Sequence, residues 1–223
     1  MVPFEEIRQR ALASKGGQAA LDALMPEHKT PRQLAALGDD RYLAQMTRCV
    51  FQAGFNWKVI ETKWDGFEEA FHGFDPRRNA FLNDEELDVL GRDKRIVRNM
   101  RRIVSVPANA RFILDIANEH GSFGKYIANW PASDLVGLWA VLKKRAARLG
   151  GNSGQYFLRF VGKDAFILSR DVVACLKGAG IIATDNPTSA RDHAAIQAAF
   201  NAWHEETGLP YGHLSRISSA SMG

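Results

Sequence analysis

Apolar side chains recur every three or four residues along most of the chain, which is the period of an α-helix. Between positions 39 and 50, for example, Leu43, Met46 and Val50 fall on one helical face. The same pattern predicts further helices over residues 4–13, 57–71, 84–90, 95–120, 134–148, 155–160, 170–176 and 188–207. No alternation is long enough to indicate a β-sheet, and no segment repeats. The pattern therefore predicts an all-α fold.

Particular residues mark where several of these helices begin or break. Thr30 followed by Pro31 is typical of a helix start, because proline lacks a backbone donor that the first turn leaves unused. Asn83 is expected to cap the helix that follows it. Pro107 is expected to break or kink the long helix around it. The serine-rich segment 215–223 is expected to be loose.

The composition is that of an ordinary soluble protein. Of 223 residues, 46% are hydrophobic and 24% are charged, enough for a real core. No apolar run approaches the roughly 20 residues of a membrane span, and the first residues lack the features of a secretory signal. We therefore expect a cytoplasmic protein with no membrane partner, in which Cys49 and Cys175 are buried thiols rather than a disulfide. The six histidines are scattered and no Cys-x-x-Cys pair occurs, so no zinc site is expected.

The positive charge is concentrated in two short stretches. The net charge is +4 and the pI about 9.2, which permits nucleic-acid binding without requiring it. Six basic residues fall within 92–102, and Lys143, Lys144, Arg145 and Arg148 form a second cluster. Either cluster alone is equally well explained as a solvated helix face. Two clusters, each beside a loop of small residues, favour a phosphate-binding surface.

The segment 49–57 contains an unusual helix end. Gly54 is expected to supply a left-handed cap, which would project the next residue, Phe55, from the end of the helix. Trp57 follows two positions later. From the residue types alone, an ordinary helix corner with both aromatic rings buried is the favoured interpretation, and an exposed pair is the alternative.

Five short motifs, in this order, resemble one family. They are Gln-Ala-Gly-Phe-Asn-Trp at 52–57, Phe-His-Gly-Phe-Asp-Pro at 71–76, Ile-Val-Arg-Asn at 96–99, Asn-Ala-Arg at 109–111 and Leu-Lys-Lys-Arg at 142–145. Together they resemble the bacterial type I 3-methyladenine DNA glycosylase family, which belongs to the helix-hairpin-helix DNA glycosylase superfamily. The resemblance covers roughly residues 41–160. It implies an all-α fold of two helical lobes with a cleft between them.

The resemblance implies roles for residues within and just before the first motif. Phe55, with Gly54, would enter the duplex as a wedge beside a flipped base. Trp57 would stack on that base, and a cationic alkylated base would gain from the electron-rich ring. Phe51 would be a second pocket aromatic and Gln52 a polar pocket group. Cys49 stands where the family has a glutamate that contacts the base, which leaves the substrate preference open.

A glycine-rich turn at 149–154 matches the hairpin of this superfamily. Gly150 and Gly151 would let the backbone approach a phosphate, and Asn152 and Ser153 lie where the next helix points its N–H groups. Lys144 and Arg148 would add positive charge. The alternative is a flexible linker.

The catalytic residue is ambiguous. The segment 163–171 resembles the part of other superfamily members that holds a catalytic aspartate, and Asp171 is the candidate. A strict register places Ser169 at that position instead, so that Ser169 would be a helix cap and Asp171 an acid of the first turn. No lysine lies at 153–156, where bifunctional relatives place their Schiff-base amine, so a monofunctional hydrolase is expected.

These observations predict a monomeric DNA glycosylase without cofactor or metal, acting at the nucleoid on double-stranded DNA with a damaged, 3-methyladenine-like base. The expected domains are an N-terminal helical extension at 1–40, the glycosylase domain at 41–210 and a flexible tail at 211–223. The family's zinc ligands and its N-terminal pocket segment have no counterpart here. A non-catalytic lesion-binding protein of the same fold is the alternative, and a helical protein–protein module is a third possibility.

Overall fold

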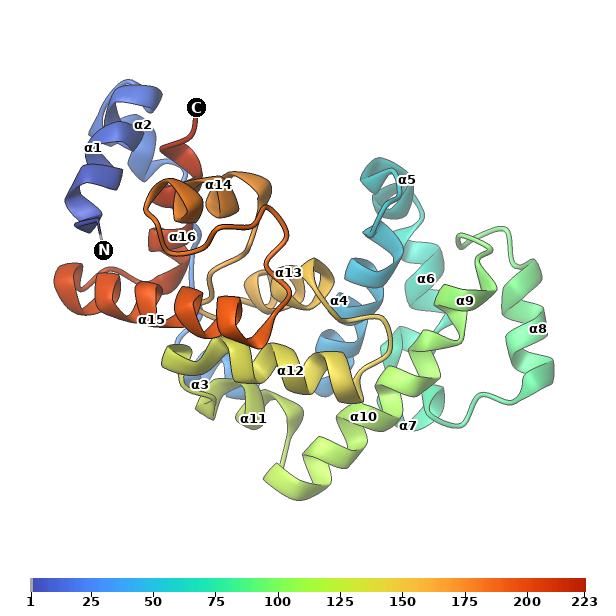
Figure 1. The fold of residues 1–223 in the computed structure, drawn as a ribbon. Helices are drawn as coiled ribbons and strands as arrows, with labels where there is room; N and C mark the ends of the chain where they lie inside the picture. Colours follow the sequence, from blue (N-terminus) through green and yellow to red (C-terminus); the bar gives the residue numbers. More distant parts are fainter. Residues whose placement is uncertain (1) are drawn as a thin grey trace. The chain divides into compact units, whose positions relative to one another are not determined.

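A computed structural model describes residues 2–223, and its regular elements are all α- or 3₁₀-helices, with no β-strand in that range (Figure 1). The all-α prediction is therefore confirmed. The chain divides into two compact units: unit 1 is 1–28, 130–138 and 162–223, and unit 2 is 29–129 and 139–161. The N-terminal residues thus do not form a separate extension of 40 residues, because residues 29–40 belong to unit 2.

Unit 2 contains most of the helices. They are α3 (Pro31–Ala36), α4 (Asp39–Gln52), α5 (Trp57–Thr62), α6 (Trp64–Ala70), η1 (His72–Phe74), α7 (Pro76–Asn79), α8 (Asp84–Arg92), α9 (Met100–Ile103), α10 (Ser105–His120), α11 (Phe123–Asn129), most of α12 (Leu135–Arg145) and α13 (Asn152–Val161).

Helix α4 lies at the centre of unit 2, where it packs against α10, α11 and α13. Leu43, Met46 and Val50 are buried on its inward face, as the spacing predicts. Tyr42 fixes the start of the helix, because its hydroxyl donates to the carbonyl oxygen of Leu34 at 2.9 Å. The burial of this apolar stripe is what holds α4 in place, since a helix of this length is only marginally stable alone.

Two of the helix starts were correctly predicted. Thr30 and Asn83 each accept a hydrogen bond from the third residue of the helix that follows, and the side chain of that residue bonds back to the cap. These reciprocal bonds satisfy two backbone donors that helix ends otherwise leave unpaired.

Two long helices of the sequence prediction are each divided in the structure. The segment 57–71 breaks at Lys63, between α5 and α6, where Trp64 begins a stack of rings that includes Phe74 at 5.4 Å. The segment 95–120 begins only at Met100 and breaks at Val104, not at the proline. Pro107 lies in the first turn of α10, where its missing N–H has no helical partner in any case.

Unit 1 joins the two ends of the chain. Its helices are α1 (Phe4–Lys15), α2 (Gln18–Asp22), η2 (Ala132–Asp134), the first turn of α12, α14 (Arg170–Gly178), α15 (Ala190–Thr207) and α16 (Tyr211–Ala220). The N-terminal α1 lies beside the C-terminal α16 (Figure 1). The backbone N–H of Phe4 donates to the carboxylate of Glu206 at 3.0 Å, which fixes the start of α1.

The expectation of a flexible tail at 211–223 is wrong. Tyr211–Ala220 is helix α16, and Leu214 and Ile217 are buried. The helix is held at its start by Asp164, whose carboxylate accepts from the backbone N–H of Gly212 at 2.7 Å. The serines that suggest a loose segment pack inward instead: Ser218 is fully buried.

Candidate nucleic-acid site

The end of α4 and the start of α13 enclose a pocket of ≈ 270 Å³ in unit 2. Its lining residues come from two separate stretches of the chain and are Cys49, Gln52, Ala53, Gly54, Trp57, Asn152, Ser153, Tyr156 and Phe160. The structure therefore brings together residues of the first motif of the sequence analysis and residues of the glycine-rich turn at 149–154. The volume lies close to the lower end, roughly 300 Å³, of the range for small-molecule pockets.

Trp57 stands at this pocket and is 47% exposed, so the interpretation of a buried helix corner is wrong for it. It is the first residue of α5, and the side chain of Asn56 caps that helix by accepting from the N–H of Lys58 at 3.0 Å. Tyr156 and Phe160 approach its ring nearly perpendicularly, with centroid distances of 6.4 and 6.0 Å. The ring of Trp57 is thus held in place by its neighbours, yet nearly half of the residue is open to solvent.

Phe55 is also exposed, at 42%. The turn before it depends on Gly54, whose φ of +65° lies in the left-handed region that residues with a Cβ rarely adopt. Its exposure is what an intercalating wedge requires, and it distinguishes Phe55 from the aromatic residues of the core.

Phe51 does not belong to the pocket. It is fully buried and packs against Phe67, with centroids 4.7 Å apart and the rings at 74°. The physical reason is the helical period, because a residue next to Gln52 points about 100° away from it around the axis of α4. Phe51 therefore belongs to the hydrophobic core of unit 2.

Gln52 is buried and bonded within the pocket wall. Its amide Nε2 donates to Glu61 at 2.9 Å, while its Oε1 is enclosed with no hydrogen-bond partner among residues 2–223. Glu61 also faces the guanidinium of Arg48 at 3.7 Å, and that group lies 4.0 Å from the ring centroid of Trp64. Glu61 therefore orients Gln52, and the sequence analysis did not identify it.

Cys49 is a buried free thiol, as is Cys175 in unit 1. Burial raises the pKa of the Cys49 thiol to about 11, despite the hydrogen bond that its sulfur accepts from Gln45 at 3.5 Å. At neutral pH the pocket therefore presents an uncharged thiol at this position.

The hairpin residues lie at the start of α13. Gly151 has a φ of +59°, and the helix begins at Asn152. Asn152 and Ser153 line the pocket itself as well as forming the hairpin. Arg148 is exposed and adopts a φ of +63°, an uncommon conformation for a residue with a long side chain. Lys144 is exposed on α12.

Asn109 fixes this hairpin, and the sequence analysis gave it no role beyond its motif. Its Oδ1 accepts from the N–H of Ala147 at 2.7 Å, and its Nδ2 donates to the carbonyl of the same residue at 3.2 Å. The side chain thus replaces a backbone partner for the residue before Arg148. The available signal was the helical spacing of Asn109 from Val106 and Ile113, which places it on the apolar face, where a polar group must find partners.

Asp171 lies in unit 1, whereas the pocket lies in unit 2. Asp171 is exposed in the first turn of α14, and its Oδ2 accepts from the hydroxyl of Ser219 at 3.3 Å. Ser169 is the N-cap of this helix and accepts from the N–H of Val172 at 3.3 Å. The capping role that the sequence left open for Ser169 is therefore confirmed.

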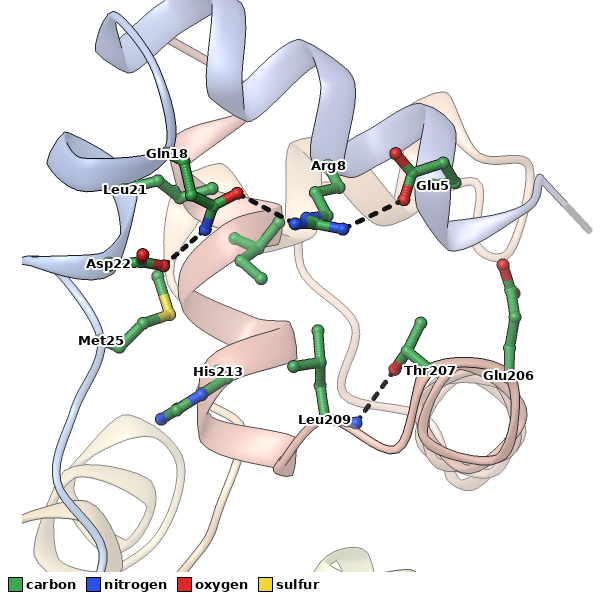
Figure 2. Close-up of a pocket in the computed structure, with 11 residues that line it drawn as sticks. Glu5, Arg8, Gln18, Leu21, Asp22, Met25, Glu206, Thr207, Leu209 and His213 are labelled. Atoms are coloured by element: carbon green, nitrogen blue, oxygen red, sulfur yellow. Dashed lines mark hydrogen bonds and ion pairs between the residues drawn. The ribbon is translucent and has the colours of Figure 1, made fainter.

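A second pocket, of ≈ 360 Å³, lies in unit 1 between α1, α2 and the C-terminal helices (Figure 2). Arg8 lies between Glu5 at 3.5 Å and Gln18 at 2.9 Å, and Gln18 in turn donates to Asp22. Because these polar groups pair with one another, we assign this pocket no role in base recognition.

Residues 2–223 contain no group of three or more histidine, cysteine, aspartate or glutamate side chains arranged to hold a metal ion. Within the same range, no helix is both long and apolar enough to cross a bilayer.

Solved structures show to which class this fold belongs. A crystal structure of 3-methyladenine DNA glycosylase I matches 61% of this chain and 83% of its own, with a TM-score of 0.50 and 24% identity. The 8-oxoguanine glycosylase/lyase of Methanocaldococcus jannaschii, solved with DNA containing 8-oxoguanine, matches 95% of both chains with a TM-score of 0.52 and 15% identity. The fold is that of the helical DNA glycosylases.

The sequence comparison is more specific. The model of the methyladenine glycosylase family matches residues 34–147, just over half of the chain, and the chain belongs to that family. The DNA-3-methyladenine glycosylase 1 of Escherichia coli K12 is 29% identical over 76 residues, and the Haemophilus influenzae enzyme is 26% identical over the same length. The match covers 34% of this chain and 41% of each of those proteins. The hairpin at 149–154 lies beyond the residues that match the family model.

Proposed function

We propose that this protein is a monofunctional DNA glycosylase that hydrolyses the N-glycosidic bond of an alkylated, 3-methyladenine-like purine in duplex DNA. The observation that carries the proposal is the pocket of unit 2, which places the exposed ring of Trp57 beside the hairpin residues Asn152 and Ser153. Family membership supports the same conclusion. We further propose that it acts as a monomer in the cytoplasm.

The pocket chemistry suits a flipped, positively charged base. A base must leave the stack before an enzyme can attack its glycosidic bond, and the exposed Phe55 would fill the gap in the duplex. The electron-rich face of Trp57 would stabilise a cationic purine by about 1–2 kcal/mol once water is displaced. Cys49 adds no charge to the pocket, so cation–π attraction takes a larger share of recognition than in relatives with a carboxylate there.

The reaction needs little acid catalysis. When the bond between the base nitrogen and C1′ breaks, its electron pair neutralises the positive charge of the alkylated base, which leaves as a neutral molecule. A water oxygen then bonds to C1′ and releases a proton. A carboxylate near the sugar would stabilise the developing positive charge and accept that proton. We propose Asp171 for this role, because it is an exposed acid in the segment that resembles the catalytic segment of the superfamily.

Substitution of Asp171 tests the assignment. Asp171→Asn should lower single-turnover release of 3-methyladenine from methylated duplex by about 100-fold, a typical loss for an electrostatic or general-base group. Asp192→Asn is the matched control, because Asp192 also lies in the first turn of a unit 1 helix, α15, beside the N-cap Ser189. Equal rates in the two variants would remove Asp171 from the mechanism.

A specific observation favours a second candidate, a lesion-binding protein without catalysis. Both positions at which the resemblance leads us to expect a carboxylate hold another group: a neutral thiol at Cys49 and a capping hydroxyl at Ser169. If wild type and Asp171→Asn both bind methylated duplex tightly and neither releases a base, this candidate replaces the hydrolase.

A further inference from the structure

Arg102, on α9, holds the turn that carries Phe55. One guanidinium nitrogen donates to the carbonyl oxygen of Phe51 at 2.5 Å, and another donates to that of Ala53 at 2.6 Å. These carbonyls belong to the last turn of α4 and its cap, where no further helical N–H is available to them. Arg102, a residue of another helix, therefore caps the C-terminal end of α4.

The same guanidinium faces the wedge. Its central carbon lies 5.6 Å from the ring centroid of Phe55, within the range of a cation–π contact. One side chain thus contacts the residues on both sides of Gly54, the left-handed hinge of the turn. The position of Phe55 relative to α4 depends on where this guanidinium lies.

Arg102 also retains capacity for an anion. A guanidinium has five N–H donors, and the two bonds to carbonyls leave three. No carboxylate forms an ion pair with Arg102 or with Arg148 among residues 2–223. Burial, and then the positive charge of Arg148, lower the pKa of Arg102. Arg102 and Arg148 thus each carry a guanidinium that is not ion-paired with a carboxylate among residues 2–223, and such groups are suited to bind a phosphate.

Hydrogen bonds also connect the segment that carries Arg102 with the residue before Arg148. Asn109, further along from α9 on α10, holds the backbone of Ala147, so the position of Arg148 relative to this helix is fixed. The hairpin and the wedge turn are therefore both tied to the segment of α9 and α10 by hydrogen bonds to backbone atoms.

We propose that Arg102 is a positioning residue that shares a DNA backbone phosphate with Arg148 and couples the binding of that phosphate to the placement of Phe55 in the duplex. The inference rests on the proposed DNA-binding function but does not require base release. A bound phosphate would hold the guanidinium between DNA and the carbonyls of Phe51 and Ala53. The position of Phe55 would then be fixed only when the DNA phosphate is bound to Arg102.

The test compares two variants of adjacent arginines by DNA affinity. Arg102→Met and Arg101→Met each remove one charge from α9, but the exposed Arg101 contacts neither the wedge turn nor Phe55. The probes are an undamaged duplex and the same duplex with one tetrahydrofuran abasic analogue, titrated at several salt concentrations. Arg102→Met should reduce the preference for the abasic duplex about 10-fold and lower the salt slope by about one. Arg101→Met should leave the preference unchanged.

Two further variants separate the role from simple loss of structure. Arg102→Lys keeps the charge but loses the two-pronged geometry, so it should keep the salt slope while losing most of the preference. A double-mutant cycle between Arg102→Met and Phe55→Ala should show that the two effects on the preference are not additive.

The outcomes are distinct from those that test glycosylase activity. Equal preferences in Arg102→Met and Arg101→Met, or an unchanged salt slope in Arg102→Met, would overturn the inference. So would a wild-type protein that does not distinguish the two duplexes. The expected pattern in a protein that releases no base would uphold the inference and overturn the hydrolase.

Discussion

Cys49 shows how burial determines the charge of a pocket residue. The buried thiol holds its proton up to a pKa of about 11, whereas an unfolded cysteine titrates near 8.5. In a Cys175→Ala background, we expect the alkylation rate of native Cys49 by iodoacetamide to keep rising above pH 9.5. The chain unfolded in urea should show a midpoint near 8.5. Because the folded state binds the proton more tightly, the unfolding free energy should fall as pH rises from about 8.5 to about 11. A native midpoint near 8.5 would contradict the assignment.

Arg148 is in a left-handed conformation that costs a residue with a Cβ about 1–2 kcal/mol. Arg148→Gly removes that cost but makes the unfolded chain more flexible, so urea unfolding should give a free energy unchanged or up to about 1 kcal/mol higher. The affinity for duplex DNA should fall in the same variant. Lys143→Gly, in helix α12, is the control and should lose about 1 kcal/mol. If Arg148→Gly loses as much unfolding free energy as the control, the left-handed backbone at Arg148 is not strained.

At the residue scale, the sequence identified Cys49, Gln52, Gly54 and Trp57 correctly as neighbours, because they lie within nine positions around the turn between α4 and α5. It could not separate Phe51 from them, since aromatic character does not show which way a residue points. Glu61 escaped detection for another reason: its role depends on a hydrogen bond to Gln52 that only the packing of α5 against α4 creates.

At the scale of elements, Asn109 fixes the hairpin to α10. Asn109→Ala should lower the unfolding free energy by about 1–3 kcal/mol, because the N–H and carbonyl of Ala147 lose their partners. Duplex affinity should fall with it. Asn118→Ala, on the exposed face of the same helix, should change the free energy by no more than about 0.5 kcal/mol. Equal effects of the two substitutions in urea unfolding would show that the hydrogen bonds between Asn109 and Ala147 contribute nothing to stability.

Helix starts were predicted better than helix breaks, and the reason is physical. The caps at Thr30 and Asn83 are local, so the residues that make them lie within four positions of each other. At the break after Lys63, by contrast, Trp64 stacks on Phe74, ten residues away. A regular apolar period continues through that break and gives no sign of it.

At the scale of the whole molecule, the two ends of the chain form one unit. The contact between Phe4 and Glu206 spans more than two hundred positions, and no local pattern indicates it. The wrong expectation of a flexible tail at 211–223 has the same cause. Its serines suggest a loose segment, but Ser215 and Ser218 are buried by contacts of α16 with residues distant in the sequence. The family match at 34–147 covers the first pocket motif, while Asp171 and the hairpin lie beyond it.

The central claim is that Trp57 recognises an alkylated base that the protein releases from DNA. The direct measurement is single-turnover release of free 3-methyladenine from methylated duplex by wild type, Trp57→Ala and a control, Phe81→Ala. Phe81 is an exposed aromatic residue of the same unit that does not line the pocket. We expect wild type and the control to release the base at equal rates and Trp57→Ala to be slower by about 10- to 100-fold, the loss of stacking and cation–π attraction. No release by wild type, or equal release by Trp57→Ala, would contradict the account.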